Sequence, residues 1–91
     1  MSTITGYAPT CHLNGTAQGV LYEQVTDALA ALRGAQEALD HAYPNARDYY
    51  PQGPGAFEGA RAAHASRATR LREIQEELQT IAEAIVDQGG F

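Results

Sequence analysis

The chain contains no lysine, only one cysteine and no long apolar run. Each of these features argues against a class of protein. Its 91 residues include six arginines and eleven acidic residues, which gives a net charge of −5. This balance argues against general binding to nucleic acid or anionic membranes, because phosphate contacts need clustered basic side chains. The exclusive use of arginine suits bidentate contacts with anions, but a GC-rich genome is the simpler explanation.

The lone Cys11 excludes an internal disulfide framework and is compatible with a reducing cytoplasm. No stretch approaches the roughly 20 apolar residues that cross a bilayer. The amino terminus also lacks the basic start and apolar core of a signal peptide. We therefore expect a soluble, cytoplasmic protein.

Side chains that perform catalysis or bind metals are few and scattered. His12 follows the cysteine directly, but His41 and His64 lie far along the chain, without Cys-x-x-Cys or His-x-x-x-His spacing. The adjacent Glu76 and Glu77 fall on a charged helical face rather than in a concave site. The sequence therefore predicts no enzyme, no metal site and no cofactor.

Two long stretches, residues 17–43 and 56–88, repeat apolar or small residues at alternating spacings of three and four. This pattern is typical of helices that pack on another helix. In the first stretch the expected seam residues are Leu21, Val25, Ala28, Leu32, Ala35, Leu39 and Ala42, with Leu29 widening the stripe. In the second they are Phe57, Ala60, His64, Arg67, Leu71, Ile74, Leu78, Ile81 and Ile85.

Prolines and glycines predict a loop over residues 44–55, and residues 1–15 read as an extended arm with one short strand at most. We therefore predict an all-α single domain, residues 1–91: an antiparallel hairpin of two long helices with an extended N-terminal arm. The outer apolar edges of two helices need further cover, which favours a homo-oligomer of undetermined number.

The second predicted helix has its arginines in the first half and most of its acidic residues in the second half. This arrangement is opposite to the one that the helix dipole prefers. It would serve antiparallel pairing between protomers, or it is a solvated face with local pairs such as Arg72 with Glu76. The pattern leaves both interpretations open.

The predicted loop is long for a helix connection and unusually aromatic. Tyr49 and Tyr50 would either contact a partner or fold back to cap the apolar end of the hairpin. His64 and Arg67 lie near the loop and could form an anion pocket with Arg47. Alternatively, Arg67 extends from the helix edge and His64 packs in the seam.

The loop sequence Asn-Ala-Arg-Asp-Tyr-Tyr at residues 45–50 is followed by a charged helix and the ending Ile-Val-Asp-Gln-Gly-Gly-Phe. This C-terminal half resembles small all-helical accessory proteins of phages and mobile elements, and among them the type II-C anti-CRISPR proteins. The resemblance implies a non-enzymatic inhibitor in the bacterial host cell that docks on a CRISPR effector nuclease and blocks its DNA engagement. By position, the partner-binding residues would be Arg47, Asp48, Tyr49 and Tyr50.

The sequence Ile-Thr-Gly-Tyr at residues 4–7 resembles the amino-terminal motif of phage proteins that sequester cyclic nucleotide immune signals. This resemblance implies an alternative function as an oligomeric sponge, although the first-helix lysine of those proteins is missing here. A tyrosine ring can stack on a base and guanidinium groups can bind phosphate. The candidate ligand-binding residues are Tyr7, Arg61, His64, Arg67 and Arg70. A structural scaffold is the third alternative.

Overall fold

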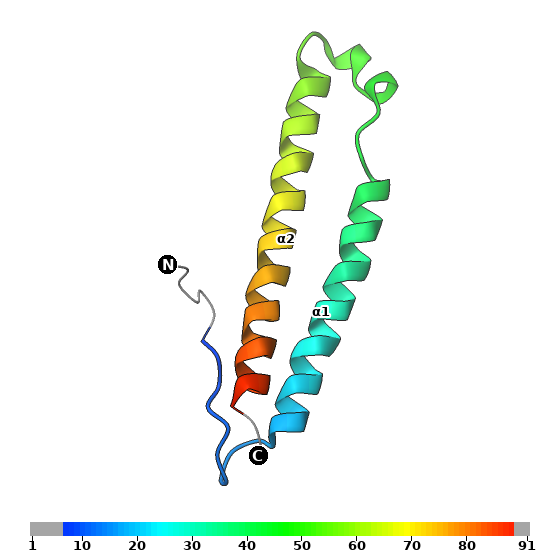
Figure 1. Cartoon of the computed structure of the whole chain (residues 1–91). Helices are drawn as coiled ribbons and strands as arrows, with labels where there is room; N and C mark the ends of the chain where they lie inside the picture. The colour runs from blue at the N-terminus through cyan, green and yellow to red at the C-terminus, as the bar shows by residue number, and fades with distance from the viewer. Residues whose placement is uncertain (1–6, 89–91) are drawn as a thin grey trace.

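The computed structural model describes residues 7–88. Two long helices, α1 (Gln18–His41) and α2 (Ala56–Asp87), are joined by two short 3-10 turns, η1 (Ala46–Asp48) and η2 (Tyr50–Gln52). The helices lie side by side and run antiparallel, with the loop at one end and the N-terminal arm at the other (Figure 1). Residues 7–88 contain no strand, and the predicted all-α hairpin is confirmed.

The hairpin is a single layer of helices. Its principal dimensions are 61 × 27 × 16 Å. Within residues 7–88, the buried side chains are few: Cys11, Leu29, His64, Ala82 and Ile85. Domains normally bury their apolar surface between two packed layers. The broad faces of this hairpin therefore remain open.

Pro44 determines where α1 ends. The residue before a proline is disfavoured in the helical conformation, and proline itself cannot continue the hydrogen-bond pattern. Tyr43 instead turns its ring edge-on toward His64, with the ring centroids 5.2 Å apart. The first helix therefore ends at His41, earlier than the predicted boundary, whereas α2 begins at the predicted Ala56.

The face of α1 that packs on α2 is turned relative to the predicted one. The expected seam residues Ala28 and Ala35 are exposed, whereas Leu29 is buried and Gln36 is half-buried. Leucine removes more apolar surface from water than alanine does, which favours the orientation that buries Leu29. The seam prediction was wrong at the two alanines, and also at Ala42, which is exposed.

Helix α2 is turned in the same sense. Arg67 and Ile74, both expected in the seam, are exposed, and their neighbours Ala68 and Gln75 are half-buried instead. Burying an arginine would cost its hydration, which explains why the seam prediction failed at Arg67. The changes fall on alternate seam positions, Ala28, Ala35 and Ala42 in α1 and Arg67 and Ile74 in α2. Over these stretches each contact face is therefore rotated by about half of the 100° between successive residues, about 50°.

Two glutamines meet in this turned seam. Gln75 Nε2 donates a hydrogen bond to Gln36 Oε1 at 2.8 Å and a second one to the carbonyl oxygen of Leu71 at 3.3 Å. A slipped pairing of the helices would leave the two amides facing apolar side chains without this bond. The glutamine pair therefore favours one register of the hairpin.

We expect Gln36→Ala and Gln75→Ala to show a coupling free energy of about 0.5–1.5 kcal/mol in a double-mutant cycle, because the bond is partly shielded from water. Urea unfolding of the two single variants and the double variant measures it. The exposed pair Arg33 and Gln79, whose side chains meet at 3.5 Å, is the matched control and should couple less. Equal coupling free energies in the two cycles would show that the position in the seam does not strengthen the hydrogen bond between Gln36 and Gln75.

The N-terminal arm is tied to the last turn of α2. The backbone N–H of Cys11 donates to Gln88 Oε1 at 2.7 Å, and Gln88 Nε2 donates to the carbonyl oxygen of Pro9 at 2.8 Å. Gln18 Nε2 also donates to the carbonyl oxygen of Ile85 at 2.8 Å. The first part of the predicted arm, residues 1–6, and the last three residues of the chain, 89–91, lie outside the described residues.

Candidate functional site

The loop between the helices has a defined structure that its sequence favours. Asn45 Oδ1 accepts a hydrogen bond from the backbone N–H of Arg47 at 3.1 Å and so begins η1. Gly53 and Gly55 have φ values of 106° and 87°, in the left-handed region that glycine adopts without strain. These turns set the direction in which the chain enters α2.

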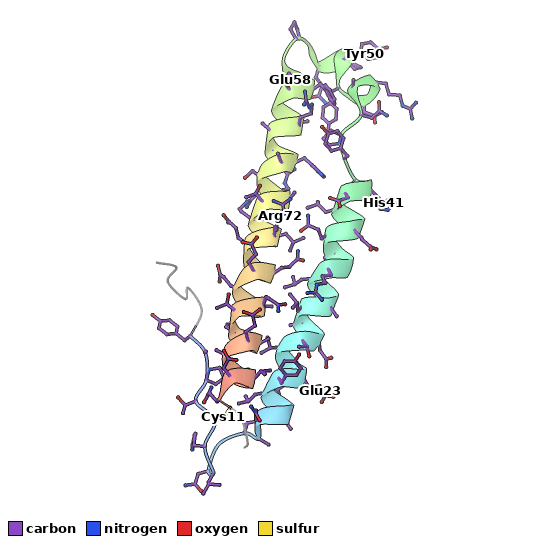
Figure 2. The ribbon with its side chains drawn as sticks, in the orientation of Figure 1. Cys11, Glu23, His41, Tyr50, Glu58 and Arg72 are labelled. Atoms are coloured by element: carbon purple, nitrogen blue, oxygen red, sulfur yellow. The ribbon has the colours of Figure 1, made fainter. Side chains whose placement is uncertain are left out.

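The two adjacent tyrosines of the loop have different environments. Tyr49 is half-buried, and its ring lies 6.4 Å from the ring of Phe57, centroid to centroid. Tyr50 is 78% exposed. Figure 2 shows Tyr50 at the tip of the hairpin, away from the two long helices. Capping therefore describes Tyr49, while Tyr50 is free to contact a partner.

Three of the four predicted partner-binding residues are exposed, and we call these loop residues the tip surface: Arg47, Asp48 and Tyr50. It combines a cation, an anion and a phenol on consecutive turns of the loop. Charged groups of this kind form strong hydrogen bonds with complementary charges. Tyrosine and arginine are also among the side chains that most often dominate the binding energy at protein interfaces. The tip surface is chemically suited to a protein partner.

Beneath the tip surface, Arg61 is held in a fixed position. Its Nε donates to the Tyr43 hydroxyl at 3.2 Å, and its Nη1 pairs with the Glu58 carboxylate at 3.0 Å. Its guanidinium also lies 5.7 Å from the centroid of the Phe57 ring. The hydrogen bond that Arg61 donates to the Tyr43 hydroxyl oxygen and the negative charge of Glu58 raise the pKa of Arg61. Arg61 thus remains a cation at the base of the loop.

The sequence patterns did not single out Tyr43 or Glu58 as neighbours of the site. The spacing of three between Glu58 and Arg61 along a helix is a signal that could have found this pair. Tyr43 gave no comparable signal, because its contacts with Arg61 and His64 join residues of different segments.

The remaining predicted ligand-binding residues are spread over the hairpin. His64 is buried against Tyr43, whereas Arg67 and Arg70 are exposed. Tyr7 is 99% exposed and belongs to the arm, which is bonded to the opposite end of α2. About 40 Å of helix separates that end from Arg61. One copy of the chain therefore does not bring Tyr7 and Arg61 together.

Within the part of the chain that the structure describes, no three His, Cys, Asp or Glu side chains gather where they could hold a metal ion. None of the described helices combines the length and apolar character that crossing a membrane requires.

The fold and the loop define a class of protein: a two-helix hairpin with a charged, aromatic tip. Comparison with known proteins yields no matching family, curated protein or solved structure.

Proposed function

We propose that this chain is a non-enzymatic inhibitor of bacterial immunity that binds a defence effector protein through its tip surface and blocks the effector's contact with nucleic acid. The observation that carries the proposal is the shared exposure of Arg47, Asp48 and Tyr50 on a structured loop at the end of a long hairpin. These residues also carry the sequence resemblance to type II-C anti-CRISPR proteins.

The charge and shape of the hairpin support inhibition by occupying a binding site. CRISPR effectors hold nucleic acid in a positively charged channel. A chain with a net charge of −5 is attracted to such a channel and repels DNA from it. In this scheme the tip surface provides the specific contacts, and the 61 Å length of the molecule extends acidic surface away from them.

The test uses a purified type II-C effector loaded with guide RNA and measures its binding to labelled target DNA. We expect the full chain to reduce DNA binding when present in stoichiometric amounts. Combining Arg47→Ala with Tyr50→Ala should weaken this inhibition at least tenfold, because it removes two side chains of the kind that dominate interfaces. Circular dichroism should show unchanged helicity, since both side chains are exposed. Tyr49 is left intact because it packs near Phe57.

Tyr7→Ala is the matched control, because Tyr7 is another exposed tyrosine but belongs to the N-terminal arm, which is bonded to the opposite end of α2. It should inhibit as well as the unmodified chain. If no type II-C effector of a representative panel binds the chain, the proposal is wrong. An equal loss of inhibition in the Tyr7 variant and the tip variant would also contradict it.

The sponge for cyclic nucleotides ranks second. The guanidinium of Arg61 already engages Tyr43 and Glu58, which leaves fewer of its donors for a phosphate. A sponge predicts tight, stoichiometric uptake without hydrolysis in a calorimetric titration with a panel of cyclic nucleotides. Heat of binding that disappears with Tyr7→Ala would reverse the ranking.

A further inference from the structure

An open hollow lies at each end of the hairpin. Near the arm, a hollow of about 250 Å³ is bordered by residues that include Tyr22 of α1 and Val86 of α2. Near the loop, a hollow of about 240 Å³ is bordered by residues that include Tyr43, Ala62 and Ala65. Ala65 and Val86 are 21 residues apart, so at 100° per residue their side chains project about 60° from each other around α2. Both hollows thus open on one broad side of the hairpin, which we call the groove face.

The N-terminal arm does not cover the groove face. Gln88, which binds the arm, follows Val86 by two residues and therefore projects about 200° around the helix from it. Val86 is 53% exposed, and Tyr22 is exposed as well. Large apolar side chains on an open face of a single-layer protein require cover from another molecule.

We propose that the groove face binds the groove face of a second copy of this chain, with the two α2 helices antiparallel across a twofold axis. Charge complementarity identifies the occupant. Arg72, at the middle of α2 (Figure 2), and Glu76 are equally distant from residue 74. If the twofold axis passes through α2 at the level of residue 74, Arg72 of each copy lies level with Glu76 of the partner subunit. The symmetry then repeats this ion pair, so the dimer contains it twice.

The same register brings the two hollows level with each other. Ala62, which borders the hollow near the loop, and Val86, which borders the hollow near the arm, are equally distant from residue 74. Each hollow of one copy therefore lies level with the other hollow of the partner subunit. One register pairs the opposite charges and aligns the two hollows along α2.

The groove face is large enough for a stable dimer. A specific interface buries about 800 Å² on each partner. The broad side of the hairpin measures 61 × 27 Å, so covering about half of it provides that area. A second copy would also convert the single layer into two packed layers, the arrangement that buries apolar surface in ordinary domains.

Sedimentation of the full chain tests the dimer through charge reversal. We expect a particle of twice the 9.7 kDa chain mass. Arg72→Glu and Glu76→Arg should each weaken the dimer at least tenfold, because each places like charges across the axis. An equimolar mixture of the two variants should form a heterodimer, since the reversed positions then face each other with opposite charge. Such rescue between two different chains cannot come from contacts within one helix.

Arg70→Glu is the control, because Arg70 is exposed and lies about 200° around α2 from Arg72. It should leave the dimer intact, and circular dichroism should show all three variants to be helical. A monomeric unmodified chain would overturn the proposal. So would a dimer that Arg70→Glu weakens as much as Arg72→Glu does, or a mixture that does not form the heterodimer.

Discussion

Replacing Ile85 by alanine is expected to lower the free energy of unfolding by about 2–4 kcal/mol, and replacing Ile74 by alanine is expected to lower it by less than about 1 kcal/mol. The two isoleucines belong to the same helix, and both were expected in the seam. Ile85 is 0% exposed, whereas Ile74 is 46% exposed. Truncating Ile85 leaves a cavity as well as removing buried surface, while truncating Ile74 leaves neither a void nor unpaired groups.

Urea unfolding followed by circular dichroism measures both effects, at one protein concentration so that any self-association contributes equally. The pair of variants distinguishes the turned seam from the predicted one, because the predicted seam would bury Ile74 as deeply as Ile85. Equal losses at the two positions would show that the helices pack along the predicted stripe. A negligible loss at Ile85 would show that the hairpin is not held together at this end.

The second large effect concerns the arm. Gln88→Ala should make the Cys11 thiol react with a thiol reagent about 5–100 times faster than in the unmodified chain. The substitution removes two hydrogen bonds that hold the arm to α2, each of which contributes about 0.5–1.5 kcal/mol. Cys11 is 3% exposed, so a reagent reaches it only when the arm opens, and weaker attachment raises the population of that open state.

The rate of labelling under native conditions measures this opening, and the single cysteine makes the signal unambiguous. Gln79→Ala is the matched control, because Gln79 bonds to Arg33 and Glu83 and has no bond to the arm. Labelling rates that are the same in the Gln88 variant, the Gln79 variant and the unmodified chain would show that Gln88 does not hold the arm closed.

Periodicity predicted the two helices well and their contact face less well. Proline and glycine positions located the loop, and repeats of three and four located the helices, because both signals are local. The choice between Ala28 and Leu29, or between Ile74 and Gln75, depends on how two helices fit together. The Gln36–Gln75 hydrogen bond exists only after that fit is made, so a pattern that ranks residues by hydrophobicity places Ile74 inside and Gln75 outside.

In the candidate site, too, the local features could be predicted from the sequence and the contacts between segments could not. The sequence identified the aromatic loop but could not separate Tyr49 from Tyr50, because their difference arises from a neighbouring segment. The ring of Phe57 lies near Tyr49 and leaves Tyr50 exposed. The position of Arg61 likewise depends on Tyr43, which the chain brings close only after Pro44 ends the first helix.

The most direct test of the proposed function is amide hydrogen exchange of the full chain with and without a purified type II-C effector loaded with guide RNA. Binding through the tip surface predicts slower exchange in the loop, residues 44–55, with the middle of α1 and α2 unchanged by the effector. Exchange that the effector leaves unchanged throughout the chain, or that slows along the helices and not in the loop, would contradict the account.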